Sequence, residues 1–378
     1  MSQFDSSLFI ENGNALVYYA FDVGAGIDLI KAEQVLQPDA KKIQSAEKKR
    51  QAKYFEFTPP PIRIEDECPI LSVGSKFSTS KRVELLIFDF GSVSVRFQIP
   101  IHGPINDVID LSVELYENLK MQEAAKAVVE QLIKRIRPLI DRPAIAARVE
   151  DYCIFHISKT KTDLSPQDML KEHIVPLTGL LRAETSRPSD REVQEILSDR
   201  ISYGSNDVTL MSWYAAVIYG ENAEDIYTVL EFANLVLMEL SFLDSRLDKS
   251  LDEFYDYFST QHKEETLFKF DFRSKKPQMR RITQLQIDSA ISFERITNAL
   301  KLMGDDFQAR VYQLATKKMG LATWDASVTR KLSTIESIYQ KISDSEGSRR
   351  MEVMEIVIIL LIALSIMLPM IFPKLSGH

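Results

Sequence analysis

The chain has 378 residues, of which 45% are hydrophobic and 26% charged, and its formal net charge is −8. These values are typical of a globular protein long enough for two modules with a sizeable core. The acidic balance argues against a protein that coats nucleic acid through its bulk charge, although it leaves room for a local basic patch. Two cysteines, Cys68 and Cys153, fit a reducing compartment and are too few for a disulfide framework.

The N-terminal part alternates strand-like and helix-like segments. Residues 15–23 (ALVYYAFDV) form a continuous apolar run of strand length, and a helical pattern follows from about Ile27. Residues 83–100 (VELLIFDFGSVSVRFQIP) indicate two strands joined at Asp89–Ser92, which is a hairpin signal. A long helix, with room for a break, is then predicted from about Asn106 to Ile140.

A basic segment, residues 41–53, lies between the first predicted helix and the hairpin. Three prolines follow it at 59–61, and this composition is typical of an exposed loop that leads into an extended edge. Its cations are a candidate patch for an anionic partner, either lipid headgroups or the phosphates of RNA, and a solvated loop explains them equally well. They are Lys41, Lys42, Lys48, Lys49, Arg50 and Lys53.

The same order of segments then recurs. Residues 149–157 (VEDYCIFHI) predict a strand, Ser165 followed by Pro166 predicts a helix start, and residues 209–220 (TLMSWYAAVIYG) repeat the hairpin pattern. We infer a tandem duplication, with repeats at 14–145 and 147–260, that builds one mixed sheet with helices packed on it. The expected fold class is α+β, and the alternative to a duplication is that any α/β chain gives such an order.

A division near Gly220 separates the predicted α/β module, residues 1–220, from a helical part at 221–350. Apolar residues recur there at steps of three and four, which predicts a first helix of about forty residues, a second that ends at Met319, and a third. We expect an antiparallel hairpin or stalk, resembling a coiled coil, that packs on itself, on the α/β module or on another copy. The stripe of the first helix is Leu240, Leu243, Leu247, Leu251, Phe254 and Phe258, and that of the third is Trp324, Val328, Leu332, Ile335, Tyr339 and Ile342.

Residues 353–372 form an apolar run in which Glu355 is the sole charge. At about 1.5 Å per residue, a helix of this length spans about 30 Å, the thickness of the hydrocarbon core of a bilayer. We predict a transmembrane helix rather than a buried core helix, because no helical face of the run is polar. The anchor residues would include Val353, Ile356, Ile359, Leu360, Leu364, Leu368 and Phe372.

The orientation follows from the flanking charges. Arg349 and Arg350 precede the run, while Lys374 lies on the short tail 373–378, so the positive-inside rule places the bulk of the chain in the cytosol. The first residues also lack the basic region and apolar core of a signal peptide. We therefore expect a tail-anchored, single-pass protein whose first partner is the bilayer, with the bacterial inner membrane as its location.

Motifs for chemistry are sparse. Gly24-Ala25-Gly26 falls between a strand and a helix, but a dinucleotide fingerprint needs a third glycine where Leu29 stands, and a tight turn explains the glycines more simply. Cys153 and His156 are three apart, which on a strand sends their side chains to opposite faces and excludes a shared metal. We predict no catalytic, cofactor-binding or metal-binding residues, no cofactor and no small-molecule substrate.

Four stretches carry a resemblance to a known family. Residues 230–251 (LEFANLVLMELSFLDSRLDKSL), 295–321 (RITNALKLMGDDFQARVYQLATKKMGL) and 331–344 (KLSTIESIYQKISD), with the apolar run, resemble the required-for-meiotic-nuclear-division family of membrane-anchored proteins. The resemblance spans 14–372. It implies no established enzyme activity, homo-oligomers, and, for the mitochondrial members, support of translation at the inner membrane. For this chain it implies a bacterial-style inner-membrane protein that faces the cytosol.

Three functions are compatible with these features. The first is a non-enzymatic, homo-oligomeric scaffold or tether at the cytosolic face of the membrane, because the apolar stripes need partners and tethering raises local concentration. The alternative is a membrane-tethered protein that holds RNA or ribosomes through the basic segments. A nucleotide-dependent enzyme that uses Gly24 to Gly26 ranks last.

Overall fold

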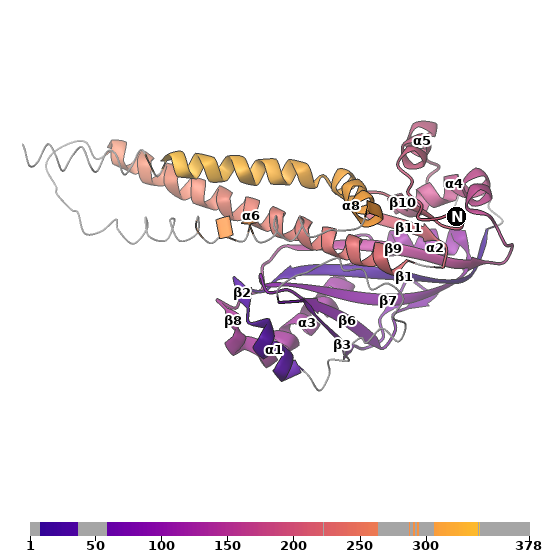
Figure 1. The fold of residues 1–378 in the computed structure, drawn as a ribbon, viewed down its shortest axis with the longest axis horizontal. Coiled ribbons are helices and arrows are strands. Elements are labelled where there is room, and N and C mark those ends of the chain that lie inside the picture. Colours follow the sequence, from indigo (N-terminus) through magenta and orange to yellow (C-terminus); the bar gives the residue numbers. More distant parts are fainter. Residues whose placement is uncertain are drawn as a thin grey trace, which may run out of the picture.

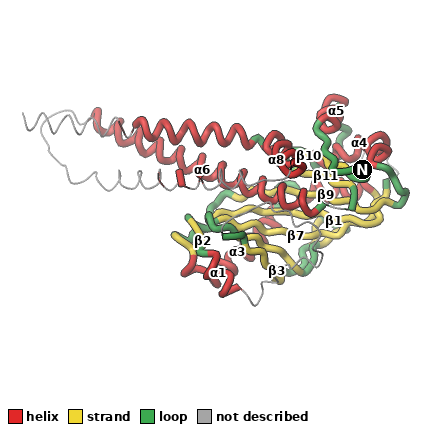
Figure 2. The backbone as a smooth tube through the Cα atoms, viewed as in Figure 1, coloured by secondary structure: helices red, strands yellow, loops and turns green. Residues whose placement is uncertain are grey.

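The computed structural model describes residues 8–36, 59–221, 223–263, 287, 290–291, 293–294, 306–338 and 340. Over these residues the chain forms a seven-stranded mixed sheet with helices on both of its faces (Figure 1). Long helices continue past one end of the sheet as a projection (Figure 2). The prediction of one mixed sheet with helices packed on it is confirmed.

All neighbouring strands in the sheet run antiparallel except β11 and β9, which are parallel. In spatial order the strands are β10 (Val208–Met211), β11 (Ala215–Tyr219), β9 (Val149–Thr160), β1 (Phe9–Asp22), β7 (Ser92–Pro104), β6 (Arg82–Ile87) and β3 (Ile62–Glu67). Two small sheets pair β2 (Gly26–Ile27) with β8 (Ile140–Asp141) and β4 (Ser72–Val73) with β5 (Phe77–Ser78). Both predicted hairpins, β6–β7 and β10–β11, are confirmed.

Five helices cover one side of the sheet, which we call the first face. They are α1 (Leu29–Leu36), α2 (Ile105–Leu115), α3 (Leu119–Ile136), α4 (Pro166–Arg182) and α5 (Asp190–Ser198). The long helix predicted after β7 is broken between α2 and α3, where Glu117 has a positive φ of 53° and the Asn118 side chain caps α3 by accepting from the Met121 N–H. The predicted start of α4 is also confirmed, because Ser165 caps the helix and Pro166 opens it.

The opposite side, which we call the second face, is covered by α6 (Glu224–Lys263) and α8 (Asp306–Met319). Alternation along the strands assigns side chains to the two faces. On β1, Val17 and Tyr19 belong to the first core, whereas Leu16 and Tyr18 belong to the second. Since both faces are buried, β1 appears in the sequence as a continuous apolar run rather than an alternating one.

Helix α6 has 40 residues, as the spacing of its apolar positions predicts. Its first half packs on the sheet, and its second half extends beyond the sheet end (Figure 1). After α8, Gly320 adopts a φ of +68°, and the helix resumes at residues 321–338. Ser327 bonds to Asp244, and Lys331 contacts Asp244 and Asp248, so this helix runs in the same direction as α6. The intervening antiparallel partner of the predicted hairpin lies mostly outside the described residues.

The two halves share an order of elements but not a pattern of pairing. A strand, helix, hairpin and helix occur first as β1, α1, β6–β7 and α2–α3, and again as β9, α4–α5, β10–β11 and α6. However, β1 pairs antiparallel with β7, whereas β9 pairs parallel with β11. The closing helices also lie on opposite faces. The duplication and the division at residue 220 therefore stay predictions.

Candidate functional site

A buried polar layer lies between α6 and the second face of the sheet. Most of the second face is apolar, so polar side chains there call for partners. Two groups of side chains in this layer, described in turn below, carry charged or acidic residues. Its most buried members are Ser92 and Ser94 on β7, with Glu231, Asn234, Glu239 and Ser241 on α6.

The first group is an ion-pair network of Arg63 on β3, Glu84 on β6, Arg96 on β7 and Glu231 on α6. The Arg63 Nη1 lies 3.2 Å from Glu84 Oε2, and its Nη2 lies 2.8 Å from Glu231 Oε2. Arg96 completes the network by donating to Glu84 Oε1. Glu231 is only 1% exposed, so its charge depends on Arg63 for compensation. The network thus combines two guanidinium groups with two carboxyl groups.

The contacts within the network oppose the effect of burial on Glu84 and Arg63. Burial alone would raise the pKa of Glu84, but Arg96 and Arg63 outweigh burial and lower this pKa below its ordinary value. Burial would likewise lower the pKa of Arg63, yet Glu231 and Glu84 raise it. The neighbouring Tyr18 hydroxyl has a raised pKa because of burial. These shifts keep Glu84 and Arg63 charged near neutral pH, and the network joins β3, β6, β7 and α6.

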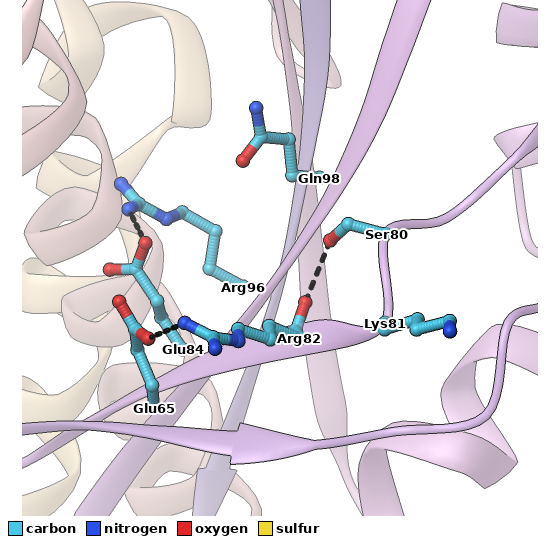
Figure 3. A pocket seen from close by; sticks show the side chains of 7 residues that line it. All are labelled: Glu65, Ser80, Lys81, Arg82, Glu84, Arg96 and Gln98. Carbon is cyan, nitrogen blue, oxygen red and sulfur yellow. Dashed lines mark hydrogen bonds and ion pairs between the residues drawn. The ribbon is translucent and has the colours of Figure 1, made fainter.

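Beside this network the sheet surface is hollowed, with a volume of about 360 Å³ (Figure 3). Figure 3 shows Arg96 and Glu84 on one side of the hollow and Lys81 pointing away from them. Arg82 pairs with Glu65 at 3.0 Å across the same surface. The hollow is lined by Glu65, Ser80, Lys81, Arg82, Glu84, Arg96 and Gln98.

The second group is an acid cluster of Asp22, Ser92 and Glu239. Asp22 ends β1 and Ser92 begins β7, and the two are partners in the register of these strands. The Ser92 Oγ–H donates to Glu239 Oε1, and Ser92 and Glu239 are almost fully buried. Burial raises the pKa of Asp22 to about 8 and that of Glu239 to about 7. Arg246, on the next turns of α6, opposes both shifts.

Gly24 is explained by close packing. A Cβ atom there would lie 2.6 Å from Cγ2 of Ile140 and 2.7 Å from the carbonyl oxygen of Asp141, and a Cβ atom on Gly91 would lie 1.9 Å from the carbonyl oxygen of Gly24. The Ala25 N–H donates to the Asp141 carbonyl at 2.9 Å, and the Ile27 N–H donates to the Asp89 carbonyl at 2.8 Å. These amides are therefore occupied within the protein rather than aimed at a phosphate.

Cys153 and His156 lie on opposite faces of β9, as predicted. Cys153 belongs to the first core, and its thiol donates to the Tyr214 hydroxyl at 3.4 Å. His156 faces α6, where its Nε2–H donates to the Gly220 carbonyl at 2.6 Å and its Nδ1 accepts from the Tyr227 hydroxyl. Burial lowers the pKa of His156, which keeps the ring neutral at pH 7. Among the described residues, no group of three or more potential ligands could hold a metal ion.

Most of the residues singled out from sequence lie outside the described ranges. This applies to the basic patch at 41–53, to the anchor at 353–372 and to its flanking charges. Within the described part of the chain, one helix, Glu224–Glu253 of α6, is long and apolar enough to cross a membrane. Because 83% of its apolar window is buried inside the protein, the core helix of a globular fold accounts for it equally well.

Comparison with known proteins identifies the sheet and the helices of its first face. Residues 12–225 match the family model described as "Uncharacterized protein MJ0711, N-terminal domain", which is more than half of the chain. The chain belongs to this family. It is similar to the uncharacterized protein MJ0711 of Methanocaldococcus jannaschii, with 27% identity over 195 residues. This alignment covers 50% of the chain and 56% of the relative, so the chain spans little more than half of that protein's length. No solved structure matches the chain.

The region of the MJ0711 N-terminal domain family ends at the start of α6. Arg63, Glu84 and Arg96 therefore lie within the family region, while their buried partner Glu231 lies just beyond it. The same boundary runs through the acid cluster, because Glu239 is contributed by α6. The polar layer thus connects the family domain to the helix that follows it.

Sequence reasoning missed the polar layer. A signal was present, because Glu84 and Arg96 interrupt strands whose alternate positions are strongly apolar, and Glu231 and Glu239 interrupt the apolar run of α6. Such charges inside buried elements need partners. Their pairing could not be read from the sequence, since Arg63 and Glu231 are 168 positions apart.

Proposed function

We propose that this protein is a non-enzymatic, membrane-tethered scaffold that assembles with copies of itself through its helical stalk. The stalk consists of the second half of α6, the described residues between 287 and 294, and residues 321–338. The observation that carries the proposal is that the stalk projects beyond the sheet with apolar side chains in solvent (Figure 1). Tyr255 is 74% exposed, Ile287 is 48% exposed and Ile291 is 46% exposed. Exposed apolar side chains on one projection favour a protein partner.

Two further features support this proposal. The apolar run at 353–372 would hold the stalk at a bilayer, with the sheet on the cytosolic side of a bacterial inner membrane. The resemblance to the required-for-meiotic-nuclear-division family points to the same combination of a membrane anchor and homo-oligomers. Confinement to a surface raises the effective concentration of the copies, so weak contacts along the stalk suffice.

Disulfide crosslinking in native membranes tests the assembly. Cys68 and Cys153 are both buried, so a single exposed cysteine reports on contacts between copies. We expect Tyr255→Cys to give a covalent dimer on mild oxidation. The matched control is Arg191→Cys on α5, whose native side chain is 88% exposed and lies away from the stalk, and it should stay monomeric. The proposal is contradicted if the Tyr255→Cys variant gives monomer alone and an amine crosslinker also gives monomer alone with the unmodified full chain.

The alternative function, contact with RNA or ribosomes, can be tested separately from self-assembly in the same membranes. Replacing Lys48, Lys49, Arg50 and Lys53 by Glu should abolish any salt-sensitive association with RNA and leave crosslinking through Tyr255→Cys unchanged. RNA that stays bound to this variant argues against the alternative, and loss of the crosslink would connect the two functions.

A further inference from the structure

The acid cluster occupies the place where α6 leaves the sheet. Asp22 is the last residue of β1 and Ser92 is the first residue of β7, so both mark the same end of the sheet. Side chains in such a cross-strand pair have Cβ atoms about 5 Å apart. Glu239 accepts from Ser92 across the interface, which brings its carboxyl group over the pair. Asp22 is half-buried, whereas Glu239 is only 2% exposed.

The charges around this cluster do not balance. Two carboxyl groups face one guanidinium, that of Arg246, seven positions after Glu239 on α6. The neighbouring charges on other elements are already paired. On β9, Arg148 lies 2.8 Å from Glu150, and on the helix 321–338, Lys331 contacts Asp244 and Asp248. Arg246 can compensate one carboxylate, so the second carboxyl group must keep a proton to remain buried without a charge.

The rest of α6 is held by separate contacts on either side of the acid cluster. Before it, the buried pair of Glu231 with Arg63 fixes the first half of α6 to β3. After it, α6 contacts the helix 321–338, and Trp324 of that helix packs under Arg148, with 5.3 Å from guanidinium carbon to ring centre. Loss of the contact at Glu239 would therefore loosen α6 at the sheet end, where the bond from Ser241 to Glu150 and the contact of Trp324 with Arg148 remain, while the first half of α6 stays in place.

We propose that the acid cluster is a proton-dependent switch: while its carboxyl groups retain a proton, α6 stays on the sheet at Glu239, and loss of that proton loosens α6 at this end of the sheet. This inference goes beyond the scaffold function and does not depend on it. Two ionised carboxylates in this buried position repel each other and exceed the single charge of Arg246.

The direction of the pH dependence follows from the raised pKa of both groups. Burial raises the pKa of Glu239 to about 7 and that of Asp22 to about 8, so at these pH values the folded protein binds more protons than the unfolded chain. The stability that the protons provide is complete at acidic pH and is lost as the pH rises through about 7 to 8. His156, which faces α6 through Tyr227, has a lowered pKa and titrates on the acidic side, outside this window.

Tryptophan fluorescence of the full chain in detergent tests the switch. The chain has two tryptophans, and Trp213 is 57% exposed, so Trp213→Phe leaves Trp324 as a reporter of the contact between stalk and sheet. We expect Trp324 emission to change sigmoidally from about pH 6 to about pH 9.5, with a midpoint near pH 8. In the same background, Glu239→Gln should abolish the change, because the amide stays neutral and still accepts from Ser92.

Two further variants provide a second test of the cluster and a control. Asp22→Asn removes the other carboxyl group and should also abolish the change, which covers the case that Glu239→Gln fails to fold. Asp252→Asn alters an exposed carboxyl on the same helix and should leave the midpoint where it is. A flat titration in the Trp213→Phe chain, or an unchanged midpoint in both cluster variants, overturns the proposal.

Discussion

Arg63 and Glu231 form a buried charge pair in the polar layer, with 2.8 Å between Nη2 and Oε2. Removal of Glu231 leaves Arg63 to share Glu84 with Arg96, so one cation loses its compensation. We expect Glu231→Ala to lower the free energy of unfolding by roughly 3 kcal/mol, the usual cost of breaking a buried pair. Chemical denaturation of the detergent-solubilised full chain measures this change.

The exposed pair of Arg82 with Glu65 provides the control. The Arg82 side chain is 63% exposed, so Arg82→Ala should cost at most about 1 kcal/mol. The double variant Arg63→Met with Glu231→Met should lose less than the sum of its single changes, because it leaves no unpaired charge. Strict additivity would show that the two side chains act independently.

At the scale of single residues, the sequence predicts the face or turn that a residue occupies better than it predicts the residues that it contacts. The opposite faces of Cys153 and His156 follow from strand alternation alone, and the structure confirms them. Gly24 lies in a bend, as the prediction of a turn implies, whereas Gly26 begins β2; the contacts that exclude a side chain at Gly24 come from Ile140 and Asp141, far away in sequence. The carboxyl groups of Asp22 and Glu239 likewise meet only because β1 and α6 stack.

At the scale of elements, local patterns predict most helices and strands. The forty-residue length of α6, the hairpin between β6 and β7 and the capped start of α4 all follow from spacing and turn chemistry. The direction of residues 321–338 along α6 does not, because an apolar stripe packs equally well on a parallel or an antiparallel neighbour. Polar pairs along the contact select the register.

Lys331 provides the main polar contact of that register. Its ammonium group lies 2.8 Å from Asp244 and 2.6 Å from Asp248, and its side chain is 15% exposed. We expect Lys331→Ala to lower the free energy of unfolding by about 1 kcal/mol and to loosen residues 321–338 from α6, visible as faster amide exchange there. Lys249→Ala removes an exposed cation from the same part of α6 and should change neither quantity. Equal effects of both substitutions would contradict a specific role for Lys331.

For the whole molecule, two apolar segments are candidates for the proposed membrane anchor. Helix α6 passes a test of length and composition, but Glu231 is paired with Arg63 and most of its apolar window is buried against the protein. The run at 353–372 has Glu355 as its single charge. Because the contacts of α6 place it in the core, we expect residues 353–372 to be the anchor of the proposed membrane protein.

Sedimentation of membranes tests whether residues 353–372 are the anchor. We expect the full chain to pellet with membranes, to resist high salt and to be extracted by detergent. A lysine at the centre of a spanning helix costs about 3 kcal/mol, so Leu360→Lys with Leu364→Lys should move the chain to the supernatant in folded form. Release of the unmodified chain by salt would instead mean that basic residues hold it at lipid headgroups. A double variant that stays in the pellet would exclude residues 353–372 as the anchor, because two buried lysines there could not be tolerated in hydrocarbon.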